Sequence, residues 1–208
     1  MEKCDSHSRN RRRGFFVDQN SSKATLPTLD FSRFHDPEKQ KGFFEDLRAA
    51  ARTFGFFYLS NQGVSSALQE KIVAISRRFF ALPEKDKFAV EMVLSPHFRG
   101  YTRAGWERTK GQADWREQFD IGAEREAVAH LPVGRPWLRL QGPNQWPDAL
   151  PDFKPILLEW QNELTRIAIE LLQAFALALG QDKDVFAPIY RARCSRSAQA
   201  VSARERKM

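Results

Sequence analysis

The side chains in this sequence that are best suited to bind a metal are four histidines, His7, His35, His97 and His130. A mononuclear non-haem iron site uses two histidines and one carboxylate, and leaves other positions on the metal open. On a strand, a histidine and an acid two residues apart would share one face. The positions two residues after these histidines hold arginine or proline, never an acid. We therefore expect no metal ligand among them, and interpret each as a surface or hydrogen-bonded residue.

The patterns of other common catalytic sites are missing or weak. The sequence has no glycine-rich phosphate loop, no dinucleotide-binding fingerprint and no serine nucleophile elbow. Cys194 has no credible base beside it, so we expect no catalytic thiol. We assign no other residue of this sequence a catalytic role. Asp114 and Glu117 are paired carboxylates in a charged stretch, and we interpret them as a solvated strand edge. Trp137 and Trp146 lie among prolines and are interpreted as residues that fill the core.

The net charge of +7 is concentrated at the two ends of the chain. Residues 1–23 carry a charge of +3 and residues 191–208 carry +5, whereas residues 24–190 contain 21 basic and 22 acidic side chains. A nearly neutral body offers no obvious phosphate-binding face, so nucleic-acid binding is not expected. Binding through the arginine-rich ends stays open as a weaker alternative. Both ends are polar enough for us to predict that they are disordered.

The composition is that of a globular domain, with 42% hydrophobic and 28% charged residues among 208. The longest apolar run, residues 171–179, is about half of the ~20 residues that a membrane span needs, so we expect no membrane partner. The first residues contain no apolar segment typical of a secretory signal. Cys4 and Cys194 are too far apart in sequence to suggest a disulfide framework. We therefore expect a reducing, cytoplasmic location.

Apolar residues at three- and four-residue steps predict amphipathic helices. Asp36 is a candidate N-cap for the first, and Gly55 is placed to end it in the left-handed conformation. Gly180 is placed in the same way after the longest helix. The predicted helices cover residues 37–54, a segment from Ser65 or Ser66 to Leu82, and residues 153–179, with short helical segments at 84–88 and from 182.

Short apolar runs bounded by turn residues predict a few strands. The run Phe56-Phe57-Tyr58-Leu59 is aromatic and continuous, which favours a buried strand. Residues 131–147 contain four prolines and two glycines and are interpreted as an ordered irregular connection. Helices and strands together indicate an α+β fold. The predicted strands cover residues 26–31, 56–59, 98–102 and 119–121.

Six short motifs follow one another over roughly residues 25–190, and their order is more specific than any one of them. They are Leu26 to Asp30, Gly55 to Val64, Arg78 to Pro83 with Lys87, Arg99-Gly100-Tyr101, Glu117 to Gly122, and Gly142 to Pro147. In this order they resemble the N-terminal region of the Fe(II)- and 2-oxoglutarate-dependent dioxygenases of the isopenicillin N synthase-like class. One departure is Gln62, where that family often has a histidine in an Asn-His-Gly turn.

The resemblance implies that residues 24–190 form a domain of helices and a few strands that wraps a double-stranded jelly-roll barrel. In the family, the barrel follows in sequence and carries the ligands of Fe(II) and 2-oxoglutarate. Eight strands with their connections need about 90 residues, whereas only 18 follow Tyr190. We therefore expect the barrel to be absent, through truncation or a shifted reading frame, with a short but functional protein as the alternative. This chain alone is then expected to bind neither cofactor and to be inactive.

The resemblance also implies oxidation of a small-molecule substrate. Arg99 and Tyr101 are the candidate residues near a substrate mouth, because arginine suits a carboxylate. The alternative for the same residues is an Arg-Gly-Tyr strand that only holds the sheet together. A second functional hypothesis is a non-catalytic protein that docks through an exposed helix face. Apolar surface left without the barrel would also favour self-association.

Overall fold

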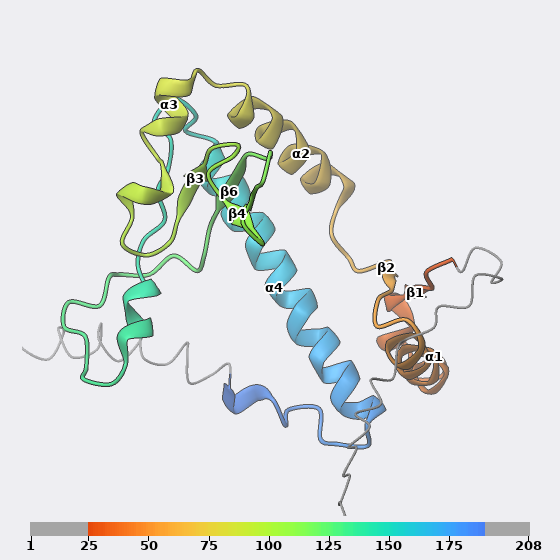
Figure 1. The fold of residues 1–208 in the computed structure, drawn as a ribbon. Coiled ribbons are helices and arrows are strands. Elements are labelled where there is room, and N and C mark those ends of the chain that lie inside the picture. The colour runs from red at the N-terminus through yellow and green to blue at the C-terminus, as the bar shows by residue number, and fades with distance from the viewer. Residues whose placement is uncertain (1–24, 190–208) are drawn as a thin grey trace, which may run out of the picture.

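The computed structural model describes residues 25–189, so the basic ends, Cys4, His7 and Cys194 lie outside the described residues. The long helix α4 (Phe153–Ala178) runs through the molecule, and the other elements gather near its two ends (Figure 1). Its apolar residues recur at the helical period, which explains why the segment is helical. Gly180 follows it with a φ of +72°, which confirms the predicted C-terminal signal.

The first group of elements packs near the C-terminal end of α4. It contains β1 (Thr28–Asp30), the 3₁₀ helix η1 (Phe31–Phe34), α1 (Gln40–Thr53) and β2 (Tyr58–Ser60). Strands β1 and β2 pair in parallel, with Leu29 opposite Leu59. The buried residues, which we call cluster 1, are Leu29, Phe31, Phe34, Phe43, Leu47, Ala50, Ile167, Ala174 and Ala178.

The second group packs against the N-terminal half of α4 and includes α2 (Ser66–Phe80) and α3 (Glu84–Phe88). Strand β3 (Gly100–Thr102) pairs antiparallel with β6 (Gln118–Asp120). The side chain of Ser65 accepts a hydrogen bond from Leu68 N, which confirms the predicted cap of α2. The buried residues, which we call cluster 2, are Ile75, Phe79, Val90, Tyr101, Leu150, Phe153 and Leu157.

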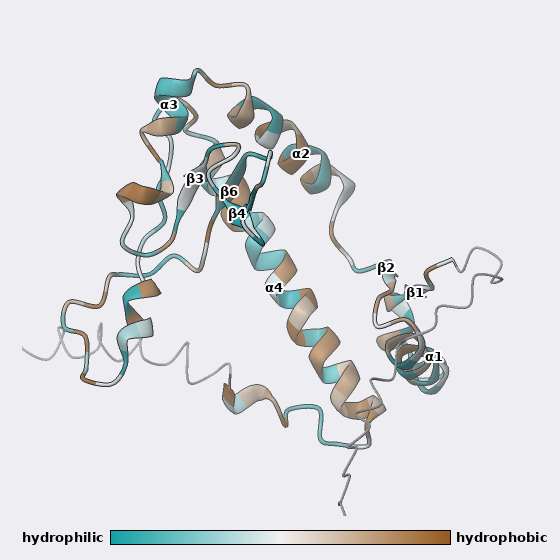
Figure 2. Cartoon of the chain, viewed as in Figure 1, coloured by the Kyte–Doolittle hydropathy of each residue, from teal (hydrophilic) through white to brown (hydrophobic). Residues whose placement is uncertain are grey.

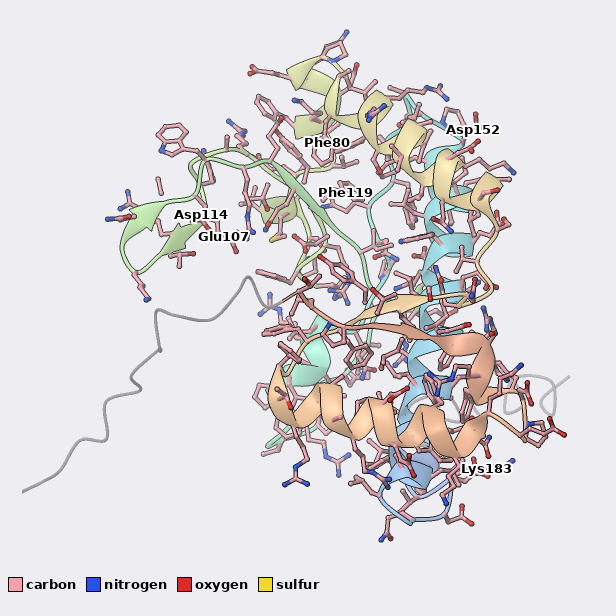
Figure 3. All side chains as sticks on the ribbon, turned by 90° about the vertical axis from the view of Figure 1, so that its right-hand side faces the viewer. Phe80, Glu107, Asp114, Phe119, Asp152 and Lys183 are labelled. Carbon is pink, nitrogen blue, oxygen red and sulfur yellow. The ribbon has the colours of Figure 1, made fainter. Side chains whose placement is uncertain are left out.

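Between β3 and β6 lies a small hairpin that the sequence analysis missed, made of β4 (Arg108–Thr109) and β5 (Gln112–Ala113). Lys110 and Gly111 form its turn with φ values of +52° and +83°, which suits a tight two-residue loop. Figure 3 shows the labelled Glu107 and Asp114 on this hairpin, which projects from the body. The 3₁₀ helices η2 (Met92–Leu94) and η3 (Pro136–Leu140) are the remaining named elements.

The α+β character is confirmed. The prediction that residues 56–59 form a continuously buried strand is wrong. The strand is Tyr58–Ser60, and Phe56 and Tyr58 are 73% and 62% exposed. Strand β2 has β1 as its partner in a two-stranded sheet, which is too small to enclose both faces of an aromatic run. The start predicted for the first helix is also early. The side chain of Asp36 accepts a hydrogen bond from Glu38 N in a turn, and α1 begins at Gln40.

The apolar stripe of α4 is only partly covered by the described residues. Ala174, Ala176 and Ala178 are buried, whereas Leu164 and Leu179 are exposed. Figure 2 colours much of α4 as hydrophobic. The small residues Ala174 and Ala178 lie in cluster 1, and Leu171, Phe175 and Leu177 of α4 pack against it while partly buried. Within residues 25–189, no helix is apolar over a length sufficient to cross a membrane.

Candidate functional site

Tyr101, one of the two predicted site residues, belongs to a partly buried hydrogen-bonded group. Lys87 of α3 donates from Nζ to Glu117 Oε1 at 2.6 Å and to the carbonyl oxygen of Phe80 at 3.3 Å. The Tyr101 hydroxyl donates to the same Glu117 oxygen. The hydrogen bond from Lys87, then that from Tyr101, lowers the pKa of Glu117. Burial, followed by the Glu117 hydrogen bond, raises the pKa of Tyr101.

This group ties α3 to both strands of the small sheet. Glu117 is exposed, in keeping with its interpretation as a solvated strand edge, but its carboxylate also accepts hydrogen bonds from a lysine and a tyrosine, which the sequence did not indicate. Asp114 does lie in the projecting hairpin, where it accepts from the Thr109 hydroxyl at 2.9 Å. For the ion pair of Lys87 with Glu117, the sequence motif had singled out Lys87, but the sequence alone did not indicate that Glu117 is its partner.

Arg99, the other predicted site residue, uses its guanidinium on backbone carbonyls. It donates to the carbonyl oxygens of His97 at 2.9 Å, Phe98 at 2.8 Å and Leu140 at 3.2 Å. Its Nε atom is buried and has no hydrogen-bond partner among residues 25–189. Arg99 therefore joins the start of β3 to the last residue of η3. These contacts favour the structural alternative for Arg99, and its role toward a substrate carboxylate stays a prediction.

The Arg-Gly-Tyr motif and the Gly-Pro-Asn-Gln-Trp-Pro motif pack against each other. Gln145 donates from Nε2 to Glu91 O and Arg99 O, each at 2.8 Å, and to Val90 O at 3.3 Å. Gly100 lies in this contact with a φ of +115°, and a Cβ there would overlap the carbonyl oxygen of Val90. The position thus requires glycine. The two motifs form one structural unit although about 45 residues separate them.

The same connection holds the end of β6. Asn144 accepts from Gly122 N at 2.8 Å and donates to Gly122 O at 2.9 Å. Its amide also donates to Glu124. Residues 131–147 therefore include an ordered connection, as the sequence analysis predicted. Trp146 packs against cluster 2, but Trp137 is largely exposed, so its interpretation as a core residue is wrong.

A cavity of about 400 Å³ lies beside this unit and is bordered by Tyr101. The carboxylate of Glu91 is buried and receives two hydrogen bonds from Arg103, one of them at 2.9 Å from Nη2. The guanidinium of Arg103 lies 3.6 Å from the ring centre of Phe88 and 4.9 Å from that of Trp106. An ion pair stacked between aromatic rings thus forms part of the wall. Sequence reasoning missed this pair, because its members lie on different elements.

Asp120, at the end of β6, is an unusual carboxylate. Its Oδ2 atom is buried and has no hydrogen-bond partner within residues 25–189. Burial raises the pKa of Asp120 and Glu107 raises it further, whereas Arg116 and Arg99 oppose the shift. The native structure therefore disfavours the charged form of this side chain.

We expect Asp120→Asn to increase the free energy of unfolding at neutral pH by up to about 1 kcal/mol, because a buried charged oxygen without a partner costs stability. The native pKa lies above the ordinary value of 3.8. Wild-type stability should therefore fall as the pH rises from that value through the native pKa. The variant does not titrate there, so its advantage should shrink toward about pH 4. Denaturant unfolding at the two pH values measures this difference.

Asp114→Asn is the matched control, because the Asp114 carboxylate has a hydroxyl partner in the hairpin. It should give no gain at neutral pH. Loss of stability in Asp120→Asn would contradict the expectation and would indicate that its carboxylate makes a stabilising interaction.

The described residues do not fit a non-haem iron. Across residues 25–189, no group of three or more His, Cys, Asp or Glu side chains is placed to hold a metal ion. His35 lies 3.3 Å from Glu170, and the Nδ1 atom of His97 lies 2.7 Å from the carbonyl oxygen of Arg139. These two histidines thus make hydrogen-bonding or ion-pair contacts rather than sharing a ligand set.

Solved structures define the class to which this fold belongs. The chain is similar to a 2OG-Fe(II) oxygenase family protein from Caulobacter crescentus, with a TM-score of 0.64 and 28% identity over 78% of this chain and 51% of that one. It is also similar to a full-length Neurospora crassa protein crystallised with alpha-KG, with a TM-score of 0.64 and 27% identity over 82% of this chain and 51% of that one. The class is that of the 2OG-Fe(II) oxygenases.

Sequence comparisons then identify the family. The family profile described as non-haem dioxygenase in morphine synthesis N-terminal matches residues 26–149. A 2-oxoglutarate-dependent dioxygenase from Dothideomycetidae sp. (strain 11243) is 33% identical over 162 residues, which are 78% of this chain and 43% of that protein. A homoarginine-6-hydroxylase from Arabidopsis thaliana is 32% identical over 164 residues, 74% of this chain and 48% of that protein. The chain belongs to the non-haem dioxygenase N-terminal family, which confirms the resemblance.

The chain spans somewhat less than half the length of these two relatives. The match to the family profile, over residues 26–149, includes all six sequence motifs. The contacts among Arg99, Gly100, Gly122, Asn144 and Gln145 give a physical reason why several of these motifs occur together.

Proposed function

We propose that this chain is the N-terminal portion of an Fe(II)- and 2-oxoglutarate-dependent oxidoreductase that acts on a small molecule. The observation that carries the proposal is the match of the N-terminal dioxygenase profile to residues 26–149. Residues 24–190 would form its N-terminal domain. The relatives reported above bear the names of dioxygenases and hydroxylases, and none is named as an interaction protein. The proposal of a non-catalytic docking protein therefore has less support.

The role of this portion is to frame the catalytic barrel and contribute to the mouth of its substrate site. We propose that the barrel, with the ligands of iron and 2-oxoglutarate, is not encoded in this chain. Tyr101 borders the cavity described above, and although its side chain packs in cluster 2, it is proposed to shape the substrate mouth from there. Arg99 is proposed to orient the mouth of the substrate site. A cytoplasmic location of the protein stays a prediction.

The isolated chain should have no oxygenase activity. Purified 208-residue protein, supplied with Fe(II), ascorbate and 2-oxoglutarate, is expected to release no more succinate than a metal-free control. A full-length relative in the same buffer serves as the positive control. Succinate that depends on added iron and is lost with a chelator would show that the chain is catalytically complete, and would overturn this part of the proposal.

A further inference from the structure

The cavity beside β3 has the size and walls of a small-molecule site. Its volume of about 400 Å³ lies within the range of ligand pockets in proteins. It is open to solvent on one side and is bordered by η2, by the β3 and β6 strands, and by the residues that lead into the hairpin. Its lining residues include Val93, Phe98, Tyr101, Thr102, Trp106 and Gln118.

Aromatic side chains stand open at this cavity instead of packing into the core. Phe98 is 58% exposed and Trp106 is 59% exposed, and neither belongs to cluster 1 or cluster 2. Phe98 also has a φ of +59°, which is uncommon for a bulky residue and costs conformational energy. The fold thus holds two large rings at the cavity where a planar ligand could stack on them.

The charges around the cavity are already compensated. Glu91 is paired with Arg103, and Glu107 is paired with Arg116 at 2.9 Å. A charged ligand would therefore find no free partner among these four side chains. Burying such a ligand without a partner would be costly.

Two uncharged polar side chains also line the cavity. Thr102 and Gln118 lie directly opposite each other on β3 and β6. Their neighbours Tyr101 and Phe119 pack toward cluster 2, so the alternation along each strand turns Thr102 and Gln118 to the other face. The side-chain amide of Gln118 makes no hydrogen bond within residues 25–189, which leaves both a donor and an acceptor. A planar lactam edge presents the complementary pair.

We propose that this cavity binds an uncharged planar ring with a lactam or amide edge, stacked on Trp106 and hydrogen-bonded by Gln118. If the chain has the proposed function, this ligand is the class of substrate that the enzyme oxidises, and to that extent the inference rests on the proposed function. Binding itself needs neither iron nor 2-oxoglutarate. It can therefore be measured on the chain as it is, apart from any catalytic assay.

The test is titration of the purified full chain with 2-pyridone in the presence of a metal chelator, followed by NMR. We expect saturable binding at one site. Trp106→Ala should weaken the affinity about tenfold or more, as the loss of a stacking platform does elsewhere. Gln118→Leu should weaken binding of 2-pyridone more than that of N-methyl-2-pyridone, whose donor is blocked but whose carbonyl can still accept a hydrogen bond. Trp137→Ala is the matched control, because Trp137 is also 59% exposed but does not line the cavity.

Three results would overturn the inference. They are the absence of saturable binding, an equal loss of affinity in Trp106→Ala and Trp137→Ala, and an unchanged preference between the two pyridones in Gln118→Leu. The thermal unfolding of each variant shows whether it is folded, and if Trp106→Ala is not, Phe98→Ala takes its place. Because the chelated chain is used, these results are independent of the succinate measurement that tests the proposed function.

Discussion

Replacing Phe79 with alanine is expected to lower the free energy of unfolding by about 3–5 kcal/mol, the usual cost of deleting a buried aromatic ring. Phe79 is fully buried on α2. Its ring centre lies 4.7 Å from those of Phe119 and Phe153, and 6.1 Å from that of Tyr101. One side chain thus joins α2, both strands of the sheet and the start of α4. Domains are commonly stable by only about 5–15 kcal/mol, so the variant should be largely unfolded at moderate denaturant.

Denaturant unfolding followed by far-UV circular dichroism measures this loss. The matched control is Val73→Ala on the same helix, because Val73 is half exposed. Its expected effect is within about 0.5 kcal/mol. A loss below about 1 kcal/mol for Phe79→Ala would mean that cluster 2 is not a tightly packed core, since a well-packed site cannot collapse around so large a cavity at low cost.

The parts of the fold that sequence predicted well are those specified by local physics. Ser65 caps α2, and Gly55 and Gly180 follow helices in the left-handed conformation, because each signal acts within one helical turn. The length of α4 followed in the same way from a long apolar period. These features need no knowledge of what packs against the helix.

The parts that sequence missed depend on tertiary partners. The apolar period of α4 did not distinguish the buried alanines near its C-terminal end from exposed Leu164 and Leu179, because the approach of α1 decides which face is covered. The run from Phe56 was predicted to be buried on its composition, yet its strand has only one neighbour in a small sheet. Composition predicts a tendency toward burial, whereas the available neighbours determine the outcome.

The candidate site shows the same division. Arg99 and Tyr101 were singled out from one motif, and the structure gives them different environments. Tyr101 borders the cavity, whereas Arg99 is committed to backbone carbonyls that lie up to 41 residues away. The exposed Trp106 and the amide of Gln118 carried no sequence signal of their own, because their relevance depends on how the strands pair.

Replacing Lys87 with methionine should lower the free energy of unfolding by about 2–3 kcal/mol. Breaking a buried ion pair by removing one partner commonly costs about 3–5 kcal/mol, and we expect less here because the Glu117 side chain is 34% exposed. Methionine keeps most of the volume of lysine and loses the charge. The loss should therefore report on the hydrogen bonds to Glu117 and to the carbonyl oxygen of Phe80.

The pH dependence separates this effect from a general loss of packing. Lys87 lowers the native pKa of Glu117 below its ordinary value of 4.5. The ion pair therefore stabilises the native state above that value, and its contribution is lost as the pH falls through the native pKa. The difference between wild type and Lys87→Met should be full at neutral pH and should decrease in acid. Lys85→Met, an exposed change in the same short helix, should leave stability unchanged at both pH values, and a pH-independent loss in Lys87→Met would assign the effect to packing rather than to the buried charge.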